Sequence, residues 1–191
     1  IYSLADRVYN CSGSDVWDGN VNVYTSDWQM PEEAELWLKA ECRLSDFPLR
    51  TGLHIEKRPG MINFSVVGRN ATMGERKMYV QYDTKTKERI RIAKEFQKFF
   101  PAIQAVVGGE TGIDIFPYGK DKAQIINDFD ELNDTLHFFG DRMDKAGNDY
   151  PLKKVILDNN LGRCYSVDDW KHTWKLLKNI STKFGQKKKQ S

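Results

Sequence analysis

The sequence predicts an α/β protein in which a core of alternating strands and helices is interrupted by an inserted lobe of strands and helices. The middle of the chain contains two strand pairs, one closed by a Pro-Gly turn and one by a Gly-Gly turn, with a long helical pattern between them. Pieces of a strand–helix alternation flank this middle on both sides. That arrangement is expected when a sheet-and-helix lid is inserted into a layered α/β core.

The front of the chain carries short strand patterns and one helix. Residues 4–9 lead into a strand ending at residues 10–13, and Val21–Tyr24 alternates as a strand after an Asp-Gly-Asn turn signal. Pro31 then opens a helix whose first turn holds three glutamates. Acidic groups are favoured there by the positive end of the helix dipole.

The lobe begins with a hairpin whose strands are His54–Arg58 and Met61–Val67. Thr72 and Glu75 predict a capping box at the start of one long helix that runs to about Phe99. The apolar face of this helix is expected to hold Tyr79, Tyr82, Ile90, Ala93, Phe96 and Phe100.

A second strand pair is expected at Ile103–Val107 and Ile113–Phe116. A helix with Lys120, Asp121 and Lys122 in its first turn should follow Pro117. The remaining elements that we expect are a buried strand at Thr135–Phe139, a strand at Leu161–Tyr165, and a last helix through Trp170 and Trp174 that Asp168 caps.

Charge and cysteine content exclude several classes of protein. The 29 basic and 27 acidic residues nearly cancel, whereas a nucleic-acid-binding protein usually shows a basic excess. The sequence shows no apolar run of the roughly 20 residues needed to cross a bilayer, and no signal peptide. Cys11, Cys42 and Cys164 are widely spaced, which favours reduced thiols in a cytoplasmic protein. The chain starts at Ile1, so we expect it to be truncated or processed at its front.

The strongest local signal for chemistry is Phe138-Phe139-Gly140-Asp141 followed by Gly147-Asn148-Asp149. An acidic residue just past an apolar strand lies where open α/β sheets bind ligands. Two carboxylates and an amide can hold a hard cation through oxygen, directly or through water. The alternative is a loop in which Asp and Asn only form turns and helix caps.

Four basic residues form a second candidate set. Lys122 can supply positive charge near a phosphate, although a lysine in a first helical turn is usually solvated. Arg58, Arg69 and Arg76 can converge at one end of the lobe, where guanidinium groups would bind phosphate bidentately. Taken singly, each arginine is more often a surface residue.

Together, three ordered blocks resemble the eukaryotic-type phosphomannomutases of the haloacid dehalogenase superfamily. The first runs from Arg58-Pro59-Gly60 to Gly68-Arg69-Asn70 and on to Glu75-Arg76. The second is Gly108-Gly109-Glu110-Thr111-Gly112-Ile113-Asp114 with Asp121-Lys122. The third is the Asp141 to Asp149 loop, and the resemblance is good from about Gly52 to Asp149.

The resemblance implies a partial haloacid dehalogenase-like Rossmannoid core with an inserted α+β cap. In residue numbers, it implies core at 1–25, cap at 26–118, the rest of the core at 119–182 and a basic flexible tail at 183–191. The cap residues implied to bind substrate are Arg58, Met61, Asn63, Arg69, Arg76, Gly112 and Asp114.

For the chemistry, the resemblance implies Lys122 and Asp141 as catalytic residues and a Mg²⁺ site at Asp141, Asn148 and Asp149. The implied activity is transfer of a phosphoryl group between positions 1 and 6 of a hexose, through an aspartyl-phosphate and with a hexose bisphosphate activator. A small phosphosugar is the expected partner, with neither nucleic acid nor membrane, and a homodimer through the cap is a further expectation.

Several departures from the family pattern leave alternatives open. We expect the nucleophile motif Asp-x-Asp to be missing from these residues. Gly112 stands where the family usually has a substrate-contacting serine, and Ala146 replaces a glycine of the metal loop. A Mg²⁺-dependent sugar-phosphate phosphatase and a non-catalytic phosphosugar- or partner-binding derivative therefore remain alternatives to a mutase.

Overall fold

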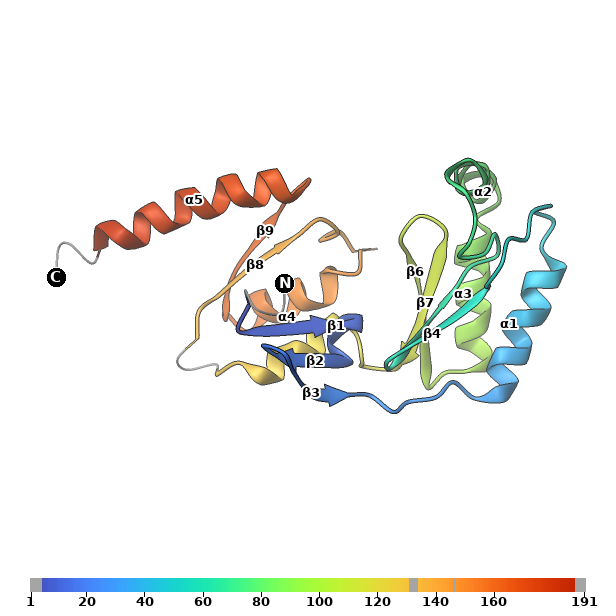
Figure 1. Ribbon diagram of the computed structural model, residues 1–191, viewed down its shortest axis with the longest axis horizontal. Coiled ribbons are helices and arrows are strands. Elements are labelled where there is room, and N and C mark those ends of the chain that lie inside the picture. The colour runs from blue at the N-terminus through green and yellow to red at the C-terminus, as the bar shows by residue number, and fades with distance from the viewer. Residues whose placement is uncertain (1–4, 131–133, 146, 188–191) are drawn as a thin grey trace. The chain divides into compact units, whose positions relative to one another are not determined.

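The computed structural model describes residues 5–130, 134–145 and 147–187, and it divides into two compact units, residues 1–125 and 126–191. Figure 1 shows the elements of both units. Leu4, Ala146 and the end of the basic tail (residues 188–191), which carry sequence-based predictions, lie outside the described residues.

The first unit opens with an antiparallel three-stranded sheet. Its strands are β1 (Arg7–Asn10), β2 (Asp15–Asp18) and β3 (Val21–Thr25), in the order β1-β2-β3. The central strand β2 was not predicted, because its two aspartates are typical of turns. In the structure Asp15 is satisfied across the sheet, where its carboxylate accepts a hydrogen bond from the Asn22 Nδ2 at 2.8 Å.

The first unit also contains a four-stranded antiparallel sheet in the order β4-β5-β7-β6. Its strands are β4 (Ile55–Arg58), β5 (Met61–Phe64), β6 (Ile103–Gly108) and β7 (Gly112–Pro117). Both predicted strand pairs are confirmed. Gly60 makes the first turn possible, because its φ of 63° is a left-handed conformation that favours glycine.

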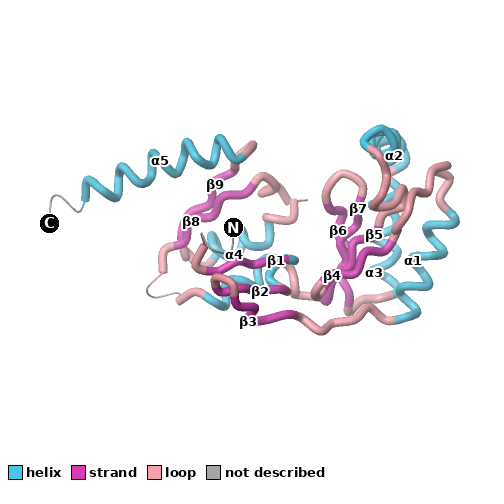
Figure 2. Tube along the Cα trace, in the orientation of Figure 1, coloured by secondary structure: helices cyan, strands magenta, loops and turns pink. Residues whose placement is uncertain are grey.

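Two helices, α1 (Glu32–Leu44) and α3 (Glu88–Phe99), cover one face of this sheet (Figure 2). Residues of the strands alternate between the two faces, so every second side chain meets the helices. The residues that fill this layer are buried and apolar, among them Leu38, Ile62, Phe64, Phe96, Ile113 and Ile115. The other face carries Glu56, Arg58, Asn63 and Asp114 together with the buried Met61.

The prediction of a single long helix after Thr72 is wrong in one respect. The structure has two helices there, α2 (Met73–Thr86) and α3. Lys87 adopts the left-handed conformation, with φ at 57°, and ends α2. The Asp83 carboxylate then accepts the Arg89 backbone N–H at 2.8 Å, which stabilises the first turn of α3. The predicted capping box of Thr72 and Glu75 is confirmed.

The break also changes the apolar face. Tyr79, Ala93 and Phe96 are buried as predicted, but Ile90 is 44% exposed and Ile92 takes its place in the core. A continuous helix would place Ile90 on the same face as Tyr79, and the turn at Lys87 rotates α3 away from that register.

A 3₁₀ segment, η2 (Lys122–Asp128), stands where an α-helix was predicted after Pro117. The second unit has two parallel strands, β8 (Leu136–Gly140) and β9 (Gly162–Ser166), connected through the helix α4 (Tyr150–Asp158). α4 was not predicted. The last helix, α5 (Trp170–Lys187), follows β9.

Two further predictions in this unit need correction. β8 is half-buried rather than buried, with only Gly140 fully covered. Asp169, not Asp168, caps α5, because its carboxylate accepts the backbone N–H of His172 at 2.8 Å. The Asp168 carboxylate instead lies 3.2 Å from the His172 ring.

No helix in the described part of the chain is both long and apolar enough to span a membrane. Cys11, Cys42 and Cys164 are free thiols, as predicted.

Candidate functional site

The face of the four-stranded sheet that is turned away from α1 and α3 carries most of the predicted substrate-binding residues. Glu56 of β4 pairs in register with Asn63 of β5, and Asn63 pairs with Asp114 of β7. These three residues therefore form one row across the sheet. Arg58 lies two positions along β4 from Glu56 and so shares this face.

Arg58 and Arg69 meet at a single carboxylate. The Arg58 Nη2 donates to the Glu56 Oε2 at 2.6 Å, and the Arg69 Nε lies 2.8 Å from the same oxygen. The Arg58 hydrogen bond lowers the pKa of the Glu56 carboxyl, so Glu56 is ionised at neutral pH. Two guanidinium groups around one carboxylate leave a net positive charge of one, which suits an anion.

Arg76 is bound to main chain rather than to Glu56. Its Nη2 donates to the Arg69 carbonyl at 2.7 Å, its Nε to the Ala71 carbonyl at 3.1 Å, and its Nη1 to the Thr111 hydroxyl at 3.4 Å. Arg76 thus fixes the segment that carries Arg69 and ties it to the β6–β7 turn. The structure brings all three predicted arginines into one neighbourhood, with Arg76 in a supporting position.

Asn63 and Asp114 are in direct contact. The Asn63 Nδ2 donates to the Asp114 Oδ1 at 2.6 Å, and Asn63 is only 5% exposed. Two glycines make room for this pair. A Cβ at Gly108 would lie 2.2 Å from the Asp114 Oδ2, and one at Gly112 would lie 2.7 Å from the Asn63 Nδ2.

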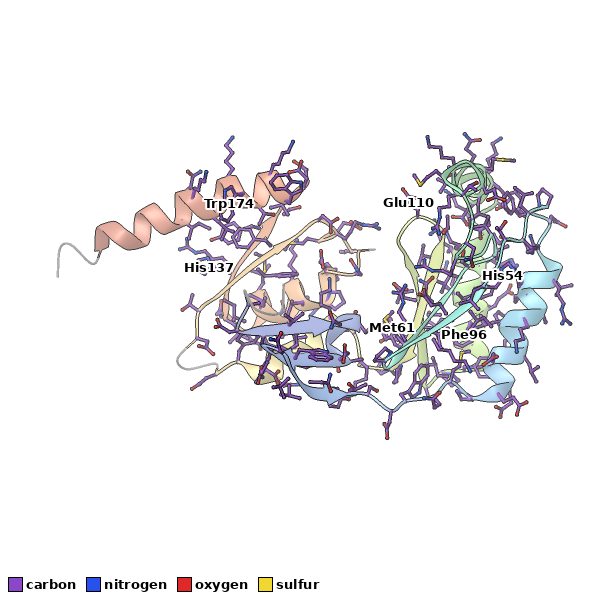
Figure 3. The ribbon with its side chains drawn as sticks, in the orientation of Figure 1. His54, Met61, Phe96, Glu110, His137 and Trp174 are labelled. Atoms are coloured by element: carbon purple, nitrogen blue, oxygen red, sulfur yellow. The ribbon has the colours of Figure 1, made fainter. Side chains whose placement is uncertain are left out.

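Met61 and Glu110 mark the two ends of this face (Figure 3). Met61 is 7% exposed beside the β4–β5 turn, where it serves as a buried apolar residue. Glu110 lies in the β6–β7 turn, next to the buried Thr111.

The sequence did not single out the loop of residues 11–14, which lies next to the arginines. Burial raises the pKa of the Cys11 thiol, and the nearby Arg58 guanidinium opposes this effect. Gly60 packs against Ser14, since a Cβ there would lie 2.5 Å from the Ser14 Oγ. A local signal was present in Asn10-Cys11-Ser12-Gly13, but only the fold brings it close to Arg58 and Gly60.

Lys122 begins the 3₁₀ segment η2 and is half-buried. The same segment reaches the loop of residues 11–14, because the Gln124 Nε2 donates to the Ser12 carbonyl at 2.8 Å. Lys122 is therefore on a segment attached to the loop that neighbours Arg58.

In the second unit, Asp141 follows β8 at the carboxyl end of a parallel strand pair, as predicted. Asp141 and Asn148 are exposed, whereas Asp149 is 3% exposed. The Asp149 Oδ2 accepts a hydrogen bond from the Arg142 backbone N–H at 3.1 Å, and the Asp149 backbone N–H donates to the Arg142 carbonyl at 3.2 Å. Asp149 thus closes the loop that presents Asp141 and Asn148.

The donor chemistry of this loop fits Mg²⁺. Its side chains offer carboxylate and amide oxygens, and Mg²⁺ typically binds one or two carboxylates and keeps several waters. Among the described residues, no group of three or more His, Cys, Asp and Glu side chains could hold a metal ion.

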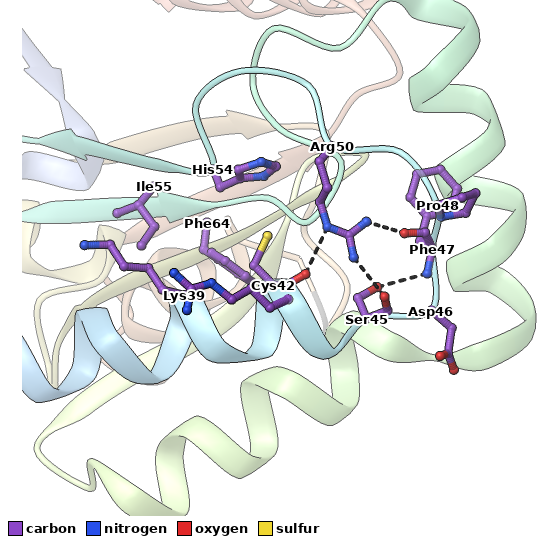
Figure 4. A pocket seen from close by; sticks show the side chains of 11 residues that line it. Lys39, Cys42, Ser45, Asp46, Phe47, Pro48, Arg50, His54, Ile55 and Phe64 are labelled. Atoms are coloured by element: carbon purple, nitrogen blue, oxygen red, sulfur yellow. Dashed lines mark hydrogen bonds between the residues drawn. The ribbon is translucent and has the colours of Figure 1, made fainter.

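A cavity of about 560 Å³ lies elsewhere in the first unit and holds none of the predicted site residues. Figure 4 shows Arg50 in its wall, where the guanidinium donates to the carbonyls of Cys42 at 2.9 Å and Ser45 at 2.8 Å. It also donates to the carbonyls of Phe47 and Leu49. Arg50 thus satisfies carbonyls at the carboxyl end of α1 and is committed to that role.

The expectation that the chain contains no Asp-x-Asp triplet is wrong, because Asp128-Phe129-Asp130 is one. It lies at the end of η2 rather than after a strand. The Asp130 N–H donates to the Asp134 Oδ2 at 2.8 Å, and the Asp134 N–H donates to the Asp130 carbonyl at 2.8 Å. The triplet is therefore part of a local turn, unlike a nucleophile motif near the N-terminus.

The fold places the chain in a known structural class. A solved structure of a mutant IMP-nucleotidase from Plasmodium falciparum with IMP bound matches with a TM-score of 0.55 and 17% identity. The match covers 92% of this chain and 48% of that chain. The chain thus shares the mixed α/β fold of that nucleotidase, in agreement with the predicted fold class.

The sequence comparisons narrow this class. The chain is 38% identical over 110 residues to a phosphomannomutase of Schizosaccharomyces pombe, covering 56% of this chain and 43% of the relative. It is 30% identical over 154 residues to one of Triticum aestivum, covering 80% of this chain and 61% of the relative. The eukaryotic phosphomannomutase family matches residues 19–183. The chain belongs to the eukaryotic phosphomannomutase family.

The match over residues 19–183 confirms the family resemblance and extends it beyond the stretch from Gly52 to Asp149. The chain spans about half the length of the curated relatives it matches.

Proposed function

We propose that the protein is a phosphohexomutase that interconverts hexose 1-phosphate and hexose 6-phosphate through an aspartyl-phosphate. The observation that carries this proposal is the polar row on the four-stranded sheet, where Arg58 and Arg69 meet at Glu56 beside the Asn63–Asp114 pair. Guanidinium groups bind a phosphate, and a carboxylate accepts hydrogen bonds from sugar hydroxyls. A phosphosugar offers both kinds of group.

The arginines hold the phosphate that does not react, and Asp114 orients the sugar. Arg76 supports Arg69 through its bond to the Arg69 carbonyl at 2.7 Å. Lys122 supplies positive charge near the attacking carboxylate, where developing negative charge needs compensation.

Asp141 and Asn148 are the groups that would hold Mg²⁺, and Asp149 orients the loop from behind. A bound Mg²⁺ would supply charge neutralisation for the transferring phosphoryl group. The attacking carboxylate of the aspartyl-phosphate is proposed to come from a part of the protein outside these 191 residues. A hexose bisphosphate serves as activator in this scheme.

We further propose a core at 1–25 and 119–182, a cap at 26–118 and a basic tail at 183–191. The protein is proposed to be cytoplasmic, to form a homodimer through the cap, and to bind neither nucleic acid nor membrane.

Turnover of mannose 1-phosphate by the intact protein tests the function, with Mg²⁺ and a catalytic amount of hexose bisphosphate. We expect mannose 6-phosphate as the product, and we expect Asp141→Asn to abolish its formation because the loop loses a carboxylate. Release of inorganic phosphate without the 6-phosphate would instead establish a phosphatase, the alternative that Gly112 favours. Binding without turnover of either kind would establish a non-catalytic binding protein.

A further inference from the structure

The Asn63–Asp114 pair has an unusual energetic feature. Asn63 is a buried asparagine in the second of four strands, and its Oδ1 has no hydrogen-bond partner within the part of the chain that the structure describes. A buried polar atom without a partner costs free energy of folding. An apolar side chain at this strand position would avoid that cost.

What the chain gains from Asn63 is the bond from its Nδ2 to Asp114. An ionised carboxylate can only accept hydrogen bonds, so the 2.6 Å contact identifies the Asn63 nitrogen as the donor. This bond occupies the Asp114 Oδ1 and fixes the direction in which the carboxylate points. An apolar side chain at position 63 could not do this.

The surroundings hold the pair in one arrangement. Gly108 and Gly112 are register partners on β6 and β7. A Cβ at Gly108 would collide with the Asp114 Oδ2, and one at Gly112 with the Asn63 Nδ2. The two glycines thus let the amide and the carboxylate lie directly against the backbone.

We propose that Asn63 is a positioning residue that orients the Asp114 carboxylate to accept sugar hydroxyls, and that it sets specificity for a polyhydroxyl phosphate ester without touching the ligand. This inference rests on the proposed function and refines the expectation that Asn63 itself binds substrate. The arginines hold the phosphate group, so the contribution of Asn63 is confined to the sugar.

A pair of variants of nearly equal shape tests this role. Asn63→Thr keeps a hydroxyl that can donate to Asp114, and Asn63→Val does not, while both residues suit a strand. Affinities of the 191-residue chain for mannose 1-phosphate and methyl phosphate are measured by calorimetry. Methyl phosphate has the same phosphate monoester but no hydroxyls, so it reports the arginines alone.

We expect Asn63→Val to lose about tenfold in affinity for mannose 1-phosphate relative to Asn63→Thr, as a hydrogen bond to a charged group implies. Its affinity for methyl phosphate should be unchanged, and its melting temperature should not fall. Asn63→Leu is the second variant if valine leaves a void.

Asn22→Val is the matched control, because it removes an amide that donates to Asp15 in the separate β1–β3 sheet. It should alter neither affinity.

Equal affinities of the valine and threonine variants for mannose 1-phosphate would overturn the proposal. A parallel loss for both ligands would also overturn it, since that pattern means a merely structural role. If the parent chain itself binds mannose 1-phosphate no better than methyl phosphate, the proposed function fails at an earlier step, and the role of Asn63 fails with it.

Discussion

Arginines that look alike in the sequence have different roles at the residue scale. The Arg69 side chain is 32% exposed and has Glu56 as its ion-pair partner. Arg76 instead donates to the carbonyls of Arg69 and Ala71 and to the Thr111 hydroxyl. Arg69 can therefore turn to a ligand at little cost, whereas removal of Arg76 leaves main-chain carbonyls without donors.

Substitution of each arginine by alanine should separate these roles. We expect Arg69→Ala to weaken mannose 1-phosphate binding by about fivefold or more. Its free energy of unfolding should change by no more than about 1 kcal/mol, because partly exposed ion pairs contribute little. Arg76→Ala should lower the free energy of unfolding by about 1–3 kcal/mol. Calorimetry and urea unfolding measure the two effects, and unchanged affinity in Arg69→Ala would remove Arg69 from the site.

At the scale of the elements, the junction between α2 and α3 is held by buried polar groups. The Tyr79 hydroxyl of α2 donates to the Glu88 carboxylate of α3 at 3.0 Å, and both residues are buried. Arg89 pairs with Asp83 at 2.9 Å and also donates to the Gly109 carbonyl at 3.3 Å. The helix break is thereby tied to the β6–β7 turn beside the site.

Tyr79 should give the protein a sensitivity to alkaline pH. Burial, together with the negative charge of Glu88, raises the pKa of Tyr79 far above its ordinary value of about 10. The unfolded chain loses this proton above about pH 10 and the folded chain keeps it, so the stability is complete below about pH 10 and falls as the pH rises further. One such group contributes a slope of about 1.4 kcal/mol per pH unit.

We expect Tyr79→Phe to remove this part of the alkaline slope, as measured by urea unfolding between about pH 8 and 11. At neutral pH the variant should be less stable by about 1–3 kcal/mol, because Glu88 loses its donor. Tyr118→Phe is the control, since Tyr118 is 73% exposed. An alkaline slope in Tyr79→Phe as steep as in the parent would contradict the assignment.

The whole molecule divides its chemistry between two units. The arginines, Asn63, Asp114 and Lys122 belong to the first unit, and the Asp141 loop belongs to the second. In the proposed function, the residues that bind phosphate and those that hold Mg²⁺ therefore belong to different units of the chain.

Hydrogen exchange should show this division. We expect methyl phosphate to slow amide exchange in β4 and β5, and Mg²⁺ to slow it in residues 141–149. Asp141→Asn should abolish the effect of Mg²⁺ and leave that of methyl phosphate intact, because the substituted residue lies in the other unit. Loss of both effects in this variant would mean that the two sites are not separate.

Local sequence signals predicted much of the four-stranded sheet and of the helices beside it. Pro59-Gly60 gave the first hairpin, and Thr72 with Glu75 gave the capping box, because each is a contact between residues close in the chain. The break at Lys87 was missed, since no Gly or Pro announces it and the Asp83–Arg89 contact forms only once the helices pack. β2 was missed because the side-chain donors that satisfy Asp15, among them Asn22 of β3, come together only in the folded sheet.

For the candidate site, the sequence by itself determined the residue types and their order: three arginines, Asp114, and an acidic loop after an apolar strand. These follow from short-range patterns and from the family resemblance that they carry. Only the tertiary structure decided that Arg58 and Arg69 share Glu56, that Arg76 supports the backbone, and that Asn63 bonds to Asp114. Such contacts join residues up to 51 positions apart, and their geometry is set by strand register and packing, which a local pattern does not encode.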